Sequence, residues 1–313
     1  MFFQPKLALV KTNSYPNAVL SSGETKYPVM VFSGGYGGFG GQNTIQMEDL
    51  ASHGYIVFSI FHTYEDFAAI FPDGKIVPCS MEQIKAFQDE LISFSKHSKD
   101  SNTRDFYNYV MNNARVVRKS IKIWSDDTRF IADQIEKLEK GEIESIFNSR
   151  LDTSSMGVFG HSFGGAAAGQ ACLTDNRFKA FINMDGTPFG DTIGNKVEQP
   201  FMILNTGKSD FSAGYSPEQK NYLIVSIKGS KHADFMDYTL LFPSLKRIGL
   251  MGSIDGNLLV RIVNDYVLSF FNKHLKGLNE PLIDQLLSRY PEVTIKNEVD
   301  GFQATFHLNH LNV

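Results

Sequence analysis

The stretch that decides the fold of this chain is Val158-Phe159-Gly160-His161-Ser162-Phe163-Gly164-Gly165. It contains the pattern Gly-x-Ser-x-Gly between an apolar run typical of a strand and a run of small residues that suits a helix. A serine on a sharp strand-to-helix turn has a strained backbone, and glycines on both sides remove the clashes that larger residues would cause. Such a turn presents the hydroxyl group at the carboxyl end of a sheet. The pattern therefore predicts that Ser162 is the nucleophile of a serine hydrolase.

Apolar runs alternate with helical patterns along the chain, which predicts a mostly parallel sheet with helices on both faces. The predicted strands are near-continuous apolar runs, as buried parallel strands are: Tyr27–Ser33, Tyr55–Phe61, Met156–Gly160, Lys179–Asp185, Pro200–Asn205 and Tyr222–Lys228. Helices are expected over Asn43–His53, Phe163–Cys172 and Leu258–Leu275. Two early stretches are interpreted as a hairpin at the sheet edge, Leu7–Lys11 and Ala18–Ser21.

A long segment, residues 62–153, separates the second predicted strand from the third. It holds three helical patterns, the first of which follows a capping box at Ser80-Met81-Glu82-Gln83. A single crossover helix is enough to join two parallel strands. The surplus helices either cap an active site or extend the scaffold, and the sequence leaves both interpretations open. We expect one domain over residues 1–313 with the α/β-hydrolase fold, in which residues 62–153 form a helical insertion.

A serine hydroxyl is a weak nucleophile and needs a base, which in this fold comes last in the chain order Ser, acid, His. His232 occupies that position, in a loop just after the last of these predicted strands. Two residues are candidates for the acid, because Asp185 ends the first strand after the serine and Asp210 follows the next strand. Both would reach the carboxyl edge of the sheet, so the spacing leaves both open. Asp234 is expected to be solvated.

A glycine-rich loop, Ser33–Gly41, follows the first predicted strand of the sheet and offers a place for an oxyanion hole. Glycines let the backbone approach a substrate closely, and we expect the N–H groups of Tyr36 and Phe163 to be the two donors. The same loop contains Gly35-x-Gly37-x-x-Gly40, a pattern typical of dinucleotide sites. The acid that such a site needs is missing from the end of the next strand, which reads Phe61-His62. An NAD-binding oxidoreductase is therefore the weaker alternative.

The bulk properties of the 313-residue chain exclude other classes. A net charge of −4 and a pI of about 6.1 argue against a nucleic-acid partner. Cys79 and Cys172 form no CxxC pair and are interpreted as buried thiols, with a single disulfide between them left open. No His-x-x-x-His pair or close Cys/His cluster occurs, so neither a metal nor another cofactor is expected. Met1–Val10 does not resemble a secretory signal, and no apolar run is long enough to cross a bilayer, which predicts a cytoplasmic location.

The chain resembles the plasma-type platelet-activating-factor acetylhydrolases and related bacterial esterases in four strings, which are Gly160–Gly165, Asp49–Val57, Arg177–Lys179 and Lys228–Phe235. The similarity runs from about Tyr27 to Leu275. It implies a calcium-independent serine esterase that removes short acyl chains, including the sn-2 acyl group of certain phospholipids. It also implies that the acid follows the strand after the serine, which favours Asp185 over Asp210. The family's oxyanion loop usually reads Ser-His-Gly, whereas this chain has Ser33-Gly34-Gly35.

The expected reaction is a two-step acyl transfer in which His232 takes the proton of Ser162 and Asp185 orients the imidazole. The expected partner is a small ester or phospholipid, with transient contact to a lipid interface through apolar segments such as Phe67–Phe71. The oligomeric state is not predicted. The alternatives are a general carboxylesterase, a polyester hydrolase, or a non-catalytic binding protein with a hydrolase fold, which normally lacks one member of the triad.

Overall fold

The computed structural model of the chain describes residues 10–98, 103–207, 211–286 and 288–297. At its centre lies a seven-stranded sheet in the order β2-β1-β5-β6-β7-β8-β9. Neighbouring strands are parallel throughout, except that β9 pairs antiparallel with β8 at one edge. The strands span Tyr27–Ser33 (β1), Ile56–Ile60 (β2), Leu151–His161 (β5), Phe178–Met184 (β6), Phe201–Thr206 (β7), Tyr222–Ile227 (β8) and Val293–Lys296 (β9).

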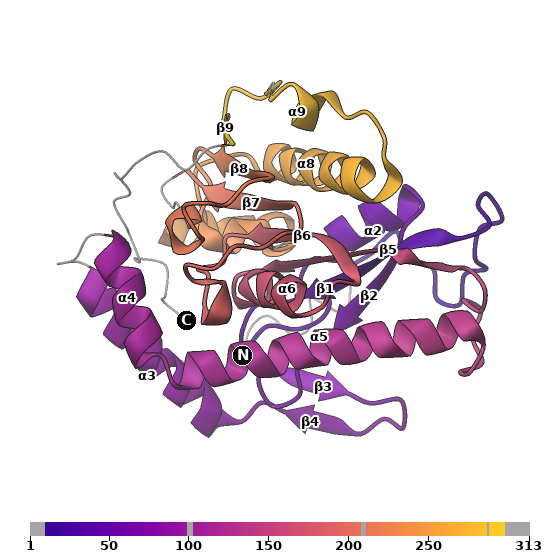
Figure 1. Cartoon of the computed structure of the whole chain (residues 1–313), viewed down its shortest axis with the longest axis horizontal. Coiled ribbons are helices and arrows are strands. Elements are labelled where there is room, and N and C mark those ends of the chain that lie inside the picture. The colour runs from indigo at the N-terminus through magenta and orange to yellow at the C-terminus, as the bar shows by residue number, and fades with distance from the viewer. Residues whose placement is uncertain (1–9, 99–102, 208–210, 287, 298–313) are drawn as a thin grey trace.

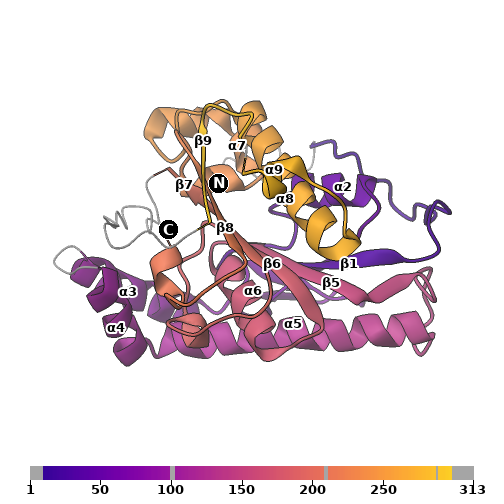
Figure 2. The same ribbon diagram turned by 45° about the horizontal axis from the view of Figure 1, so that its top comes forward.

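Helices cover both faces of this sheet, as Figure 2 shows. On one face lie α2 (Thr44–Ser52) and α8 (Gly256–Lys276), whose apolar side chains share a core with β6, β7 and β8. On the other face lie α5 (Val116–Lys140) and α6 (Phe163–Thr174). Two short helices, α7 (Tyr238–Leu241) and α9 (Pro281–Asp284), complete the C-terminal part. This layering confirms the predicted α/β-hydrolase fold.

The segment between β2 and β5 holds more than one crossover helix. It begins with a hairpin of β3 (Ala68–Ile70) and β4 (Ile76–Pro78), which forms a sheet of its own. Helices α3 (Met81–Ser98) and α4 (Thr103–Asn113) follow and pack at one end of the molecule, as Figure 1 shows. The long α5 then returns beneath the main sheet. Apolar side chains of all three helices share one core with the first turns of α6.

The structure differs from the sequence prediction mainly at short or edge elements. The early hairpin is wrong where it is described, because Ala18–Ser21 forms no strand, while residues 7–9 lie outside the described part of the chain. Strand β5 begins at Leu151, earlier than predicted, because Tyr27 pairs with Leu151 before a register shift that brings Val29 opposite Met156. The edge strand β9 and the β3–β4 hairpin were not predicted. They are only three or four residues long, too short for a clear alternation of apolar and polar residues.

Cys79 and Cys172 are both free thiols. The prediction that both are buried is confirmed for Cys172 and is wrong for Cys79, which is partly exposed. Within the described ranges, no helix combines the length and the apolar character that crossing a bilayer requires.

Candidate active site

Ser162 is the single residue between the end of β5 at His161 and the start of α6 at Phe163. Its backbone has φ 58° and ψ −125°, a conformation that is strained for any residue with a side chain. The flanking glycines leave no space for a methyl group. A Cβ on Gly160 would lie 2.3 Å from the carbonyl carbon of Gly164, and a Cβ on Gly164 would lie 2.2 Å from the main-chain oxygens of residues 33 and 34. The turn can therefore form only with glycine at both positions.

Ser162, His232 and Asp185 form one continuous chain of hydrogen bonds. The Oγ of Ser162 is 3.0 Å from Nε2 of His232, and Nδ1 of His232 is 2.7 Å from Oδ2 of Asp185. Because a carboxylate only accepts hydrogen bonds, Nδ1 carries the proton and donates it to Asp185. Nε2 is then the acceptor for the hydroxyl of Ser162, which is the tautomer that a general base needs. The three predicted residues thus meet, although His232 lies 47 positions after Asp185 and 70 positions after Ser162 in the chain.

Asp185 is held rigidly at the end of β6. Its backbone lies in the left-handed region, at φ 53°, and its N–H donates to the main-chain oxygen of Leu204 on β7 at 2.7 Å. Its Oδ1 accepts a hydrogen bond from the N–H of Thr206 at 3.1 Å, so only Oδ2 faces His232. The side chain is buried. The other candidate acid, Asp210, lies outside the described residues.

The loop that carries His232 is fixed by two carboxyl groups that follow it. Asp234 accepts from the N–H groups of Lys231, at 2.8 Å, and Gly252, at 2.6 Å. Asp237 accepts from the first N–H groups of α2, and burial raises the pKa of Asp237 to about 6. The expectation that Asp234 is solvated is therefore wrong. It is buried, because its carboxyl group supplies the acceptors for main-chain donors of two loops.

His161, the residue before the nucleophile, supports His232 from within the core. Its Nε2 lies 3.1 Å from the main-chain oxygen of His232, and its Nδ1 lies 3.1 Å from Nε2 of Gln42. A carbonyl only accepts, so Nε2 of His161 donates and Nδ1 accepts from the amide of Gln42. Burial lowers the pKa of His161 well below its usual value, so the ring stays neutral beside His232. Sequence reasoning missed Gln42, because its contact with His161 spans 119 positions and follows no local pattern.

The glycine-rich loop Ser33–Gly41 runs directly against the nucleophile. A Cβ on Gly35 would lie 3.3 Å from Cβ of Ser162, so the next residue, Tyr36, begins beside the reacting group. Phe163 is the first residue of α6, where an N–H has no partner within the helix. In the described ranges, neither the Tyr36 N–H nor the Phe163 N–H donates a hydrogen bond. The two N–H groups expected from the sequence therefore belong to segments that adjoin Ser162, and neither has an acceptor in the described ranges.

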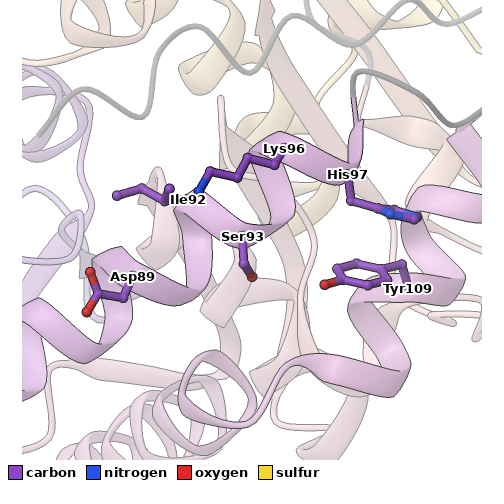
Figure 3. Close-up of a pocket in the computed structure, with 6 residues that line it drawn as sticks. All are labelled: Asp89, Ile92, Ser93, Lys96, His97 and Tyr109. Atoms are coloured by element: carbon purple, nitrogen blue, oxygen red, sulfur yellow. The ribbon is translucent and has the colours of Figure 1, made fainter.

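A hollow of about 560 Å³ lies elsewhere, on the outer side of α3 and α4 (Figure 3). Its wall consists mostly of α3 side chains, and from α4 the ring of Tyr109 stacks on that of His97 at 3.9 Å. The lining residues are Asp89, Ile92, Ser93, Lys96, His97 and Tyr109. None of them belongs to the hydrogen-bonded chain of Ser162, so the ester site is not assigned to this hollow.

Known proteins similar to this chain include esterases and acetylhydrolases. The family model described as "Platelet-activating factor acetylhydrolase, isoform II" matches residues 1–285. The platelet-activating factor acetylhydrolase of Canis lupus familiaris is 30% identical over 325 residues, which cover 94% of this chain and 69% of that protein. A "Probable 1-alkyl-2-acetylglycerophosphocholine esterase" of Arthroderma benhamiae is 28% identical over 47% of this chain and 46% of its own length. Among solved structures, a ferulic acid esterase from Streptomyces cinnamoneus matches with a TM-score of 0.65 and 25% identity, covering 86% of this chain and 74% of that one.

These likenesses confirm two predictions made from the sequence, the family resemblance and the activity of a serine ester hydrolase. The family match covers the strand-to-helix turn at Ser162, both candidate donors of the oxyanion hole and all three members of the hydrogen-bonded chain. The chain therefore belongs to the platelet-activating factor acetylhydrolase, isoform II, family of serine ester hydrolases.

Proposed function

We propose that this enzyme hydrolyses short-chain carboxylic esters with Ser162 as nucleophile, His232 as general base and Asp185 as the acid that orients the base. The observation that carries the proposal is the hydrogen-bonded chain of these residues, with distances of 3.0 Å and 2.7 Å. Such distances lie within the range that proton transfer between positioned groups requires.

The reaction follows from the positions of these groups. Nε2 of His232 takes the hydroxyl proton while Oγ of Ser162 bonds to the ester carbonyl carbon, and the carbonyl electron pair moves to its oxygen. The Tyr36 and Phe163 N–H groups donate to this oxyanion. The C–O bond to the alcohol then breaks, and the imidazolium returns its proton to the leaving oxygen. Water attacks the acyl-enzyme by the same route and releases the acid.

For the substrate we propose a glycerophospholipid with a short sn-2 acyl group. The names of the two relatives support this choice, since the canine protein is named as an acetylhydrolase of platelet-activating factor and the fungal one as a probable esterase of 1-alkyl-2-acetylglycerophosphocholine. The aromatic rings behind the oxyanion loop also support a short acyl group, because Tyr36 stacks on Phe87 at 3.6 Å and meets the edge of Phe163 at 5.5 Å. Rings packed this closely leave little volume for a long acyl chain beside Ser162.

A chain-length profile tests the substrate class. We expect kcat/KM on p-nitrophenyl esters to fall at least about tenfold between acetate and octanoate, because the added methylenes that find no fitting pocket should together cost about 1.4 kcal/mol or more. The sn-2 acetyl phospholipid should be cleaved, and its sn-2 palmitoyl counterpart should not. Equal rates on all chain lengths would instead favour a general carboxylesterase, and mass loss from a polyester film would favour a polyester hydrolase.

The assignment of the nucleophile is tested separately. A fluorophosphonate should label the wild-type enzyme at Ser162 and should not label Ser162→Ala. Ser154→Ala changes an exposed serine at the start of the same strand and serves as the matched control. Labelling of the Ser162→Ala enzyme to the wild-type extent would exclude Ser162 as the nucleophile.

We further propose that the β3–β4 hairpin touches the lipid interface that holds the substrate. Its residues Phe67, Ile70 and Ile76 are all exposed, and Ile70 and Ile76 lie opposite each other across the two strands. The hairpin is joined to the oxyanion loop, because the N–H of Phe67 donates to the main-chain oxygen of Gly38 at 2.8 Å. Large apolar side chains gathered beside a site for an amphiphilic substrate are typical of interfacial contact.

Vesicle binding tests this contact. Phe67→Ser with Ile70→Ser should weaken binding to phosphatidylcholine vesicles at least about tenfold, because each buried side chain of this size contributes about 1.5 kcal/mol or more. Hydrolysis of soluble p-nitrophenyl acetate should not change. Ile146→Ser removes an equally exposed apolar side chain beyond α5 and is the control. Equal vesicle binding by all variants would contradict the proposal.

A further inference from the structure

The oxyanion loop Ser33–Gly41 is anchored near its middle, at Gly37, by the buried residue Glu65 from outside the loop. The main-chain oxygen of Glu65 accepts the N–H of Gly37 at 2.8 Å. The carboxyl group of Glu65 in turn accepts from Oγ of Ser120, at 2.7 Å, and from Nε1 of Trp124, at 2.5 Å. Both donors belong to α5, and Glu65 is only 7% exposed. A single chain of hydrogen bonds thus leads from α5 to the residue that follows Tyr36.

The start of the loop, Ser33, is anchored to the same helix by a second chain. Oγ of Ser33 lies 2.9 Å from Nε2 of His62, and Nδ1 of His62 lies 2.8 Å from Oδ2 of Asp127 on α5. The carboxylate fixes the proton on Nδ1, so Nε2 accepts from the hydroxyl of Ser33. The ring of His62 also stacks on that of Trp124 at 3.7 Å. This Ser–His–Asp set is not a second catalytic site, because Ser33 and His62 are fully buried and no substrate can reach them.

The two anchors flank the residue that supplies the first oxyanion donor. Tyr36 lies between Ser33 and Gly37, and the loop around it is rich in glycine, which gives the backbone little stiffness of its own. An oxyanion donor must lie within about 2.7–3.1 Å of the developing charge. The conformation of this loop must therefore be imposed by groups outside it.

We propose that α5 positions the oxyanion hole through these two chains, with Ser120, Trp124 and Asp127 as positioning residues. The inference rests on the proposed function, since it assigns a role in the same reaction. The helix also holds the second donor, because its side chains Ile121 and Trp124 share a core with Phe163 at the start of α6. Figure 1 shows α5 lying alongside α6 over the whole length of the latter. The sequence left open whether the helices of the insertion cap the active site or extend the scaffold. In this proposal α5 belongs to the scaffold and holds the residues of the oxyanion hole in place.

Two pairs of variants on α5 test the proposal, and each pair consists of one test variant and its matched control. Ser120→Ala removes a hydroxyl bonded to Glu65, whereas Ser125→Ala removes an equally buried hydroxyl that contacts Thr174 on α6. Asp127→Ala breaks the second chain from a side chain that is 41% exposed, so this variant should fold even if Ser120→Ala does not. Asp126→Ala removes the neighbouring, more exposed carboxyl group and is its control.

The readouts are kcat and KM on p-nitrophenyl acetate, the Ki of a short trifluoromethyl ketone that forms an oxyanion on the serine, and the melting temperature. Ser120→Ala and Asp127→Ala should each lower kcat about tenfold and raise Ki by the same factor, with KM within twofold of wild type, because a displaced donor is missed mainly in the transition state. A merely structural role would lower the melting temperature without this matched change in kcat and Ki.

The outcomes separate the two proposals. If the wild-type enzyme is active and the members of each pair agree within twofold in kcat and Ki, α5 does not position the oxyanion hole and the proposed function stands. If the wild-type enzyme neither hydrolyses the ester nor binds the ketone, the proposed function and this inference both fail.

Discussion

Replacing Asp185 with asparagine should separate the charge of this residue from its position in the fold. The backbone at residue 185 has φ 53°, a conformation that asparagine adopts as readily as aspartate, so the turn should keep its shape. The N–H of Thr206 would continue to donate to Oδ1. The amide NH₂ of the new residue is then forced to face Nδ1 of His232, 2.7 Å from where Oδ2 now lies.

This reversal changes the tautomer of the base. An NH₂ group can only donate, so Nδ1 of His232 would become the acceptor and the proton would move to Nε2. An Nε2 that carries a proton cannot take one from Ser162, whose Oγ lies 3.0 Å away. In serine proteases the equivalent change lowers kcat by about 10⁴-fold, which corresponds to about 5 kcal/mol at the barrier. We expect a loss of that size for Asp185→Asn, with KM and the melting temperature near those of wild type.

The assay is steady-state hydrolysis of p-nitrophenyl acetate, with nitrogen NMR of His232 to identify the protonated nitrogen. Asp210→Asn is the control, since it makes the same change at the other acid that the sequence allowed. Activity of Asp185→Asn within tenfold of wild type, or a larger loss in Asp210→Asn, would refute the assignment of the acid.

Three further predictions concern the strand-to-helix turn at Ser162 and the histidine beside it. Ser162→Ala should lower kcat by about 10⁶-fold and leave the melting temperature nearly unchanged, and substantial residual turnover would show that another nucleophile acts. Gly164→Ala should destabilise the fold by about 3 kcal/mol or more in urea unfolding, because its Cβ would lie 2.2 Å from two main-chain oxygens, whereas wild-type stability would mean that the loop can retreat. Burial lowers the pKa of His161 below its ordinary 6.5, so the stability that its neutral ring provides is present above pH 6.5 and is lost as the pH falls below it. His161→Gln should therefore reduce the pH dependence of the free energy of unfolding between pH 6.5 and 5 by at most about 1.4 kcal/mol per pH unit, and an unchanged slope would contradict this account.

Much of the architecture could be predicted from the sequence because it depends on local patterns. Buried parallel strands are near-continuous apolar runs, and each of the six predicted runs overlaps a strand of the observed sheet. The Gly-x-Ser-x-Gly stretch carries its own geometric requirement, since only glycine fits at residues 160 and 164. The chain order Ser, acid, His then indicated where to look for His232. Elements of three or four residues, such as β9, lack a readable period and were missed.

The sequence alone determined the class of fold, the nucleophile candidate and the loop that faces it, because these follow from residue type and spacing within short stretches of the chain. Only the tertiary structure brought Asp185 within 2.7 Å of His232, because this contact depends on the order of β6, β7 and β8 in the sheet. The support around the site was equally hidden. Glu65 bonds to Ser120 and Trp124, which follow it by 55 and 59 positions in the chain, so its role depends on where α5 packs. A sequence specifies such a contact only through the whole fold, since long-range pairing leaves no local period to read.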